Sequence, residues 1–206
     1  MRYPCGMNQD ELPHRKRVKH FDEPSHIHEL TFSCFQRRPL LTNHEWRCLL
    51  SESIDRATAR HGYQLSAFVF MPEHVHLLVV PGGDASTIDQ LLRAIKRPYS
   101  FRIKRLLEQQ KSSLLKTLNV QQRPGARSFR YWQEGPGYDR NMDRPETVLA
   151  AIDYLHLNPV KRGFVKRAVD WQWSSARWYE GLPYGANVRV PTLEKLDAVF
   201  LGLAAR

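Results

Sequence analysis

Polar and apolar positions alternate with a period of two from His26 to Phe35, which predicts a β-strand with a different set of side chains on each face. Residues 65–71 and 74–80 are short apolar runs separated by Pro72-Glu73, and they predict two strands joined by a tight turn. A fourth strand is expected over 129–133. A hairpin between the second and third strands makes a mostly antiparallel sheet.

Apolar residues at helical spacing predict a first helix that Asn43 caps and Gly62 stops. A second helix is expected from about Thr87. Pro98 should kink or divide it before the basic stretch 101–110, because proline lacks the N–H of a helical hydrogen bond.

A third helix is predicted from Pro145 to Leu157, where Asn158-Pro159 should end it. Residues 111–127 show no clear period and are expected to form a basic loop. The predicted order of strand, helix, strand, strand, helix, strand, helix indicates an α+β fold. We expect a ferredoxin-like antiparallel sheet flanked by α-helices.

The composition is that of a globular protein, with 42% hydrophobic and 25% charged residues among 206. The three cysteines, Cys5, Cys34 and Cys48, form no CxxC pair. They indicate neither a disulfide framework nor a zinc ribbon, and they fit a reduced, cytoplasmic protein. The first twenty residues contain no apolar core of a signal peptide, and the longest apolar run, 198–205, is too short to cross a bilayer. We therefore expect no membrane association.

The net charge of +10 is concentrated in one part of the chain. Residues 93–130 contain eleven basic residues and one acid, whereas the remainder holds 20 of each. A local basic excess of this kind predicts a surface that binds a polyanion, because cations that neutralise phosphates release counterions. The alternative interpretation is a solvated basic face with no ligand.

Two histidines stand two residues apart in the predicted strand 74–80. Side chains of His74 and His76 would then point from the same face and could bind one metal ion together, while Val75 faces the core. Spacing alone also allows an ordinary hydrogen-bonded pair, and His26 and His28 form a rival pair on another predicted strand.

Tyr154 and Asn158 lie four residues apart on the third predicted helix, next to a core stripe of Val148, Ile152 and Leu155. A phenol and an amide could therefore reach one site, although packing and a helix stop explain the same residues. A tyrosine nucleophile needs help, because an ordinary phenol is almost fully protonated at neutral pH. A divalent metal bound by two imidazoles and an amide could polarise a phosphodiester. Mg²⁺ or Mn²⁺ would suit this role, and imidazole suits Zn²⁺ equally.

Two segments together resemble the single-tyrosine HUH transposases, and among them the REP-associated tyrosine transposases. They are FMPEHVHLLV at 70–79 and YLHLNPVKRG at 154–163. The resemblance extends through YWQ at 131–133, YDRN at 138–141 and WQWSS at 171–175. It covers about 150 residues with both motifs in the expected order.

The resemblance implies that His74 and His76 bind a divalent metal, Mg²⁺ or Mn²⁺, with Asn158 as third ligand, and that Tyr154 is the nucleophile. The implied reaction is cleavage of single-stranded DNA, usually beside a hairpin, with a 5′-phosphotyrosine link and a free 3′-OH that can rejoin strands. The implied fold is that of the HUH endonucleases. The pair His26 and His28 then becomes structural or DNA-contacting.

The resemblance also divides the chain. We expect a flexible basic tail over 1–23, the transposase domain over 24–180 with a variable basic insertion at 111–127, and a C-terminal extension over 181–206. A monomer or a homodimer fits the family.

Basic residues of the second helix and one further arginine are the expected DNA contacts, namely Arg93, Lys96, Arg97, Arg102, Lys104, Arg105 and Arg140. Tyr99 or Phe101 could stack on bases, but core packing is the favoured interpretation of both.

Two other functions stay open at this point. One is a domesticated protein that binds structured DNA repeats without cutting them. The other is a hydrolytic metalloenzyme that uses both histidine pairs and water as the nucleophile.

Overall fold

A four-stranded antiparallel sheet forms the centre of the protein, in the order β2-β3-β1-β6. The computed structural model describes residues 26–123, 125–135 and 137–197; the expected basic tail over 1–23 lies outside them. The strands are β1 (Ile27–Ser33), β2 (Tyr63–Phe70), β3 (His74–Pro81) and β6 (Tyr138–Met142). The predicted α+β fold with an antiparallel sheet flanked by helices is confirmed.

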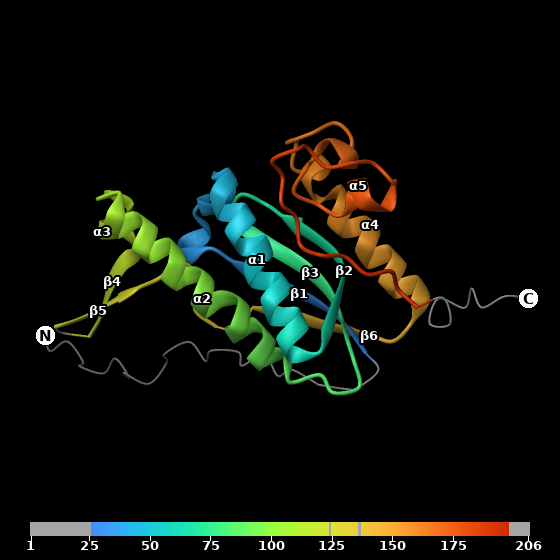
Figure 1. The fold of residues 1–206 in the computed structure, drawn as a ribbon, viewed down its shortest axis with the longest axis horizontal. Helices are drawn as coiled ribbons and strands as arrows, with labels where there is room; N and C mark the ends of the chain where they lie inside the picture. The colour runs from blue at the N-terminus through green and yellow to red at the C-terminus, as the bar shows by residue number, and fades with distance from the viewer. Residues whose placement is uncertain (1–25, 124, 136, 198–206) are drawn as a thin grey trace, which may run out of the picture.

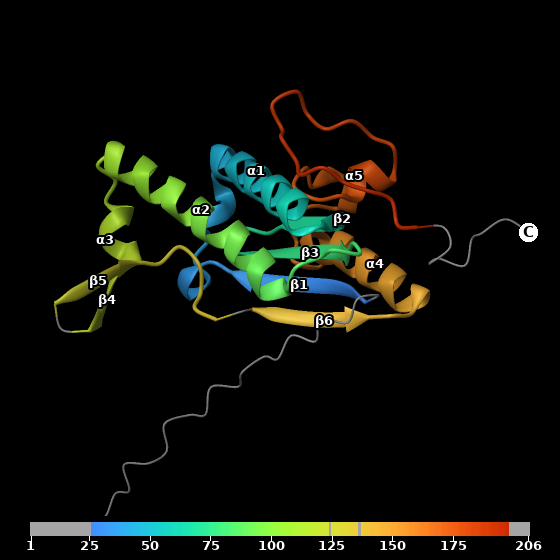
Figure 2. The same ribbon diagram turned by 60° about the horizontal axis from the view of Figure 1, so that its bottom comes forward.

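Helices cover both faces of this sheet (Figures 1 and 2). On one face, α1 (His44–His61) and α2 (Ile88–Gln109) share a core with Leu30, Phe68 and Leu77. On the other face, α4 (Pro145–Lys161) packs its apolar side on Val69 and Leu78. Shorter helices are η1 (Phe35–Arg37), η2 (Leu40–Thr42), α3 (Leu114–Leu118), η3 (Ala168–Asp170) and α5 (Ala176–Tyr179).

The boundaries of α1 follow from its two end residues. The Asn43 side chain accepts a hydrogen bond from the Trp46 amide at 3.1 Å, which satisfies one of the unpaired donors of the first turn. Gly62 follows the helix with φ +71°, and a Cβ there would lie 3.1 Å from Ala85 Cα. Both predicted ends of this helix are confirmed.

Two predicted interruptions are wrong. Pro98 lies on the exposed side of α2, which continues as one helix to Gln109. Asn158-Pro159 does not end α4 either, because the helix runs on to Lys161. Pro159 removes only one hydrogen bond in the last turn, and the amides of Arg162 and Phe164 bond to the Asn158 and Pro159 carbonyls at 3.1 and 2.9 Å.

The segment between α2 and α4 also differs from prediction. Residues 111–127 are not a loop, since they contain α3 and most of a two-stranded ribbon, β4 (Asn119–Arg123) and β5 (Ala126–Phe129). Residues 129–133 are not the fourth strand, because Trp132 makes only an isolated bridge with Cys34. That place belongs to β6, whose mostly polar sequence carries a weak strand signal.

The outer edge of β2 is paired with chain from near the C-terminus. The amide of Phe70 bonds to the Trp173 carbonyl at 2.8 Å, and that of Ser175 bonds to the Phe68 carbonyl at 2.9 Å. Farther along the same strand, the Glu194 amide bonds to the Leu65 carbonyl at 2.9 Å. Val188, Val190, Leu193 and Leu196 also pack against the hydrophobic cores, so residues 171–175 and 188–196 belong to the folded body.

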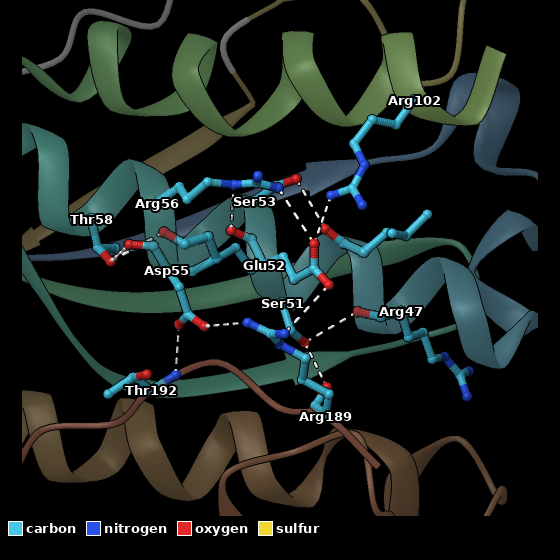
Figure 3. Close-up of polar contacts among 12 residues, drawn as sticks. Arg47, Ser51, Glu52, Ser53, Asp55, Arg56, Thr58, Arg102, Arg189 and Thr192 are labelled. Atoms are coloured by element: carbon cyan, nitrogen blue, oxygen red, sulfur yellow. Dashed lines mark hydrogen bonds and ion pairs between the residues drawn. The ribbon is translucent and has the colours of Figure 1, made fainter. Parts of the chain in front are cut away.

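Ion pairs hold the second of these segments against α1 (Figure 3). Arg189 lies 3.4 Å from a Glu52 carboxylate oxygen and 3.9 Å from one of Asp55, whose other oxygen accepts from the Thr192 amide at 2.7 Å. Among the described helices, none has the length and apolar character needed to span a membrane.

Candidate active site

Strand β3 places both histidines of the HVH motif on the sheet face that α4 covers. Val75 and Leu77 point the other way, into the core beneath α1 and α2. His74 and His76 are each 6% exposed. The predicted alternation is therefore confirmed.

The two imidazoles turn the same nitrogen toward each other. His74 Nε2 and His76 Nε2 are 3.0 Å apart. Two ligands about 2.1 Å from one ion, at right angles, would be separated by about this distance. The pair therefore fits a divalent cation placed between both Nε2 atoms.

Oxygen atoms hold the other ring nitrogens. His74 Nδ1 donates to the Glu73 carboxylate at 3.0 Å, and His76 Nδ1 lies 2.8 Å from Thr31 Oγ1. Glu29 Oε1 is 3.7 Å from the same His76 atom. A carboxylate that accepts the Nδ1 proton leaves the Nε2 lone pair of His74 for a metal, which is how ligating histidines are commonly oriented.

Charge and burial keep His74 ready to bind a cation. Burial, followed by the neighbouring His76, lowers the pKa of His74 to about 4, against the opposing effect of Glu73. Burial disfavours the charged form of Glu73, but the hydrogen bond from Arg162, together with electrostatic attraction to His74 and Arg162 and the hydrogen bond from His74, lowers the pKa of this carboxyl. At neutral pH the site holds a neutral His74 beside an ionised Glu73.

Asn158 reaches the same point from α4. It is 7% exposed, and its amide nitrogen lies 3.3 Å from His76 Nε2. A half-turn of the amide exchanges nitrogen for oxygen and would present Oδ1 to a cation. In the described chain, no three His, Cys, Asp or Glu side chains gather as a metal site. Two imidazoles and an amide leave coordination positions open, which suits a cation that also binds a phosphate.

Tyr154 lies one helical turn before Asn158, on the same side of α4. Its side chain is 47% exposed, and its ring centroid is 6.1 Å from that of His76, with the ring planes at 85°. Lys161 Nζ lies 4.9 Å from the centroid of the Tyr154 ring. The phenol is therefore open to solvent beside the histidine pair, with a cation against its ring.

A groove of about 690 Å³ runs between α4 and the β1–β6 edge of the sheet. Strands β3, β1 and β6 form its floor. Thr31 of β1 pairs with both His76 and Tyr138, and Glu29 pairs with Arg140. Tyr154 and His76 lie in its wall, so a strand bound there would pass the phenol. Its lining comprises Glu29, Thr31, His76, Tyr138, Arg140, Glu146, Thr147, Ala150, Ala151 and Tyr154.

Of the expected DNA contacts, only Arg140 lies in this groove. The other six are on α2, across the sheet from α4. Three pair with acids: Arg93 with Asp89 at 2.5 Å, Arg102 with Glu52 at 2.7 Å (Figure 3), and Lys104 with Glu108 at 3.6 Å.

The three remaining α2 cations have other surroundings. Lys96 lies over the Phe32 ring at 4.9 Å, Arg105 lies 6.0 Å from the centroid of the Phe101 ring, and Arg97 is exposed. Tyr99 is buried, as the packing interpretation predicts, but Phe101 is 62% exposed, so the packing interpretation of Phe101 is wrong.

The rival histidine pair lies elsewhere. His28 points to the α1–α2 face of the sheet and bonds through Nδ1 to Asp139 at 3.0 Å, with both side chains buried. It cannot join His74 and His76 around one ion. The structure therefore does not support a hydrolytic site built from both pairs.

Sequence reasoning missed the residues that orient the histidines. Glu73 immediately precedes His74, and Arg162 follows Asn158 by the same four residues that separate Tyr154 from Asn158, just after the end of α4. Thr31 and Glu29 alternate on one face of β1, opposite His28. The two-residue step on the strand and the four-residue step after Asn158 indicate that these residues lie on the same side as the predicted site.

The family described as "Transposase IS200 like" matches residues 24–123. This region, just under half of the chain, is therefore similar to the IS200-like transposases. The matched region includes both histidines of the motif and ends before α4, so the contribution of Tyr154 rests on the site geometry and on the sequence resemblance.

Two comparisons cover more of the chain. The REP-associated tyrosine transposase of Escherichia coli K12 is 25% identical over 146 residues, which span 70% of this chain and 73% of that protein. A solved structure described as a REP-associated tyrosine transposase bound to a REP hairpin matches with a TM-score of 0.59 at 18% identity. It covers 88% of this chain and 95% of that one, and it supports the same fold.

Proposed function

We propose that this protein is a metal-dependent transposase that cuts and rejoins single-stranded DNA beside a hairpin, through a 5′-phosphotyrosine intermediate. The observation that carries the proposal is the meeting of His74 Nε2, His76 Nε2 and the Asn158 amide beside the exposed phenol of Tyr154. The E. coli relative is named as a tyrosine transposase, and the similar solved structure holds a REP hairpin, which supports DNA as the substrate.

In the proposed reaction, Tyr154 Oη attacks the phosphorus of a phosphodiester held in the groove. A Tyr–O–P bond forms as the bond from phosphorus to the 3′ oxygen breaks. The phenol proton passes to solvent, and the leaving 3′ oxygen takes up a proton to become a free hydroxyl. Attack by a 3′-OH on the phosphotyrosine reverses these changes and joins strands without another energy source.

Each residue of the site has a distinct task. His74, His76 and Asn158 would hold Mg²⁺ or Mn²⁺, which supplies electrophilic stabilisation of the phosphate when bound. Lys161 holds positive charge against the attacking phenol, and Arg140 offers a cation to the DNA backbone in the groove. Thr31 and Glu73 fix the imidazole orientations.

A covalent-adduct assay tests this proposal. Single-stranded DNA hairpins with a labelled 3′ end are mixed with the protein and Mn²⁺, because the fragment that stays attached carries the 3′ end. We expect a labelled band that survives denaturation with the wild type and is absent with Tyr154→Phe, while both proteins bind the DNA. Adduct formation by Tyr154→Phe would overturn the assignment of Tyr154 as the nucleophile. DNA binding without any wild-type adduct would favour a non-cutting DNA-binding protein.

A further inference from the structure

Residues 111–130 form a projecting unit, here called the basic arm, that consists of α3 and the β4–β5 ribbon. In Figures 1 and 2 it extends beyond the end of α2, away from the sheet. Its two strands pair with each other and with no strand of the main sheet, and they pack mainly against α3. The proposed chemistry uses none of these residues.

The charge of this arm is extreme. Its twenty residues contain five basic side chains and no acid, so they carry half of the net charge of +10 in about a tenth of the chain. Lys111, Lys116 and Arg127 are exposed, and no acid of the described chain pairs with them. Several α2 cations, in contrast, are neutralised by neighbouring carboxylates.

One face of the ribbon carries an amide and a guanidinium, side-chain groups that can hydrogen-bond to bases and phosphates. Gln121 pairs with Arg127 across the strands, so an amide and a guanidinium lie side by side, and both residues are exposed. A two-stranded ribbon fits the major groove of duplex DNA, where such side chains contact base edges and phosphates.

The root of the arm is joined to the body by buried contacts and hydrogen bonds, and it lies near the candidate active site. Tyr131 is buried and accepts a hydrogen bond from Tyr99 at 3.0 Å. The Gln133 amide bonds to the carbonyl of Ser33, the residue that pairs with His74 across β1 and β3. The arm therefore leaves the body at the end of the sheet where His74 lies.

We propose that the basic arm binds the paired stem of a DNA hairpin while an adjoining single strand occupies the Tyr154 groove. This inference rests on the proposed function for the presence of DNA in that groove. Duplex DNA fits the arm because its phosphates complement the unpaired cations and because the ribbon has the dimensions of a groove reader. Hairpin recognition would then be separate from strand cleavage.

The test compares three proteins on two DNA probes. The arm variant combines Lys116→Gln and Arg127→Gln. The control variant combines Arg60→Gln and Lys195→Gln, which remove the same charge from exposed positions on α1 and beside β2. The probes are a hairpin with a single-stranded extension and a strand of the same composition that cannot pair, each titrated over a range of salt concentrations.

We expect wild type to prefer the hairpin and the arm variant to lose about tenfold in hairpin affinity. Its slope of log affinity against log salt should fall by about 2, as for two lost phosphate contacts. Its affinity for the unpaired strand should match the control. Equal affinity of wild type for both probes, or equal losses in both variants, would overturn the proposal.

Adduct formation on the hairpin probe, measured at saturating protein in the same preparations, separates this inference from the proposed function. If all three proteins form adducts and bind the hairpin equally well, the proposed role of the basic arm is rejected and the proposed cleavage chemistry stands. If only the arm variant loses hairpin binding and no protein forms an adduct, hairpin binding by the arm is supported and the cleavage chemistry is rejected.

Discussion

Arg162, the residue that follows the last turn of α4, donates a hydrogen bond to the buried carboxylate of Glu73. The same Glu73 oxygen accepts the Nδ1 proton of His74. A single carboxylate thus links the helix that carries the proposed nucleophile to the strand that carries the proposed metal ligands. Arg37 lies 3.5 Å from this oxygen and adds positive charge from η1.

Glu73→Gln should weaken metal binding by about 10- to 100-fold, because the amide no longer fixes the orientation and tautomer of His74. Titration of the protein with Mn²⁺, followed by electron paramagnetic resonance, measures the affinity without DNA. Glu108→Gln removes an exposed carboxylate on α2 and serves as the control. Equal affinity in both variants would show that Glu73 does not orient the ligand.

Lys161→Met should slow adduct formation by about tenfold. It removes the cation 4.9 Å from the centroid of the Tyr154 ring, which favours the negative charge on the phenol oxygen as it loses its proton and attacks. Lys161→Arg keeps the charge and should retain most of the rate. Single-turnover rates at saturating DNA measure this effect apart from binding. A slow Lys161→Arg variant would assign the role of Lys161 to shape rather than charge.

Arg140→Gln should weaken adduct formation on hairpin DNA by about 10- to 100-fold, because a charge-assisted contact to a phosphate contributes about 1.5–3 kcal/mol. Arg140 reaches into the groove, 3.9 Å from the buried Glu29. Arg60→Gln removes an exposed cation at the end of α1 and should leave the reaction unchanged. A similar loss of adduct formation in both variants would mean that the effect comes from the net charge of the protein and not from the position of Arg140.

Leu155→Ala should lower the free energy of unfolding by about 2–5 kcal/mol, because Leu155 is completely buried between α4 and the sheet. Leu157→Ala, two residues along the same helix and 42% exposed, should change it by less than about 0.5 kcal/mol. Urea denaturation measures both. Similar values would mean that α4 does not pack as described.

Lys96 should lose its proton at an unusually low pH. Burial lowers the pKa of its ammonium from 10.5 to about 8, and Asp89 opposes this only in part. Between these values the unfolded chain holds a proton that the folded chain has released, so this group makes the protein more stable as pH rises.

The measurement is the free energy of unfolding of wild type minus that of Lys96→Met, followed from pH 7 upward. The difference should rise from about pH 8. A flat difference would mean that the ammonium stays hydrated.

Much of the fold follows from local signals. Asn43 and Gly62 bound α1 by capping and by left-handed geometry, and the HVH alternation places both histidines on one face. The failures came where tertiary packing outweighs local preference. Pro98 is accommodated on the exposed side of α2, and Pro159 falls in the last turn of α4, where one lost hydrogen bond costs little.

The sequence predicts the residues that would carry the chemistry of the site, but not the residues that orient them. The motif residues stand out by type and spacing, whereas Thr31 and Arg162 act through contacts between segments far apart in the sequence. Strand β6 was missed because its sequence, YDRNM, is mostly polar. Its placement beside β1, which brings Arg140 into the groove, depends on long-range pairing.

The pairing of β2 with residues 173–175 and 194 has a consequence for self-association. An open outer strand exposes a row of backbone donors and acceptors and is a common starting point for edge-to-edge aggregation. Here several of those groups already have partners within the chain. Strand addition by a second molecule at β2 would first have to displace these segments, so this side of the sheet resists polymerisation.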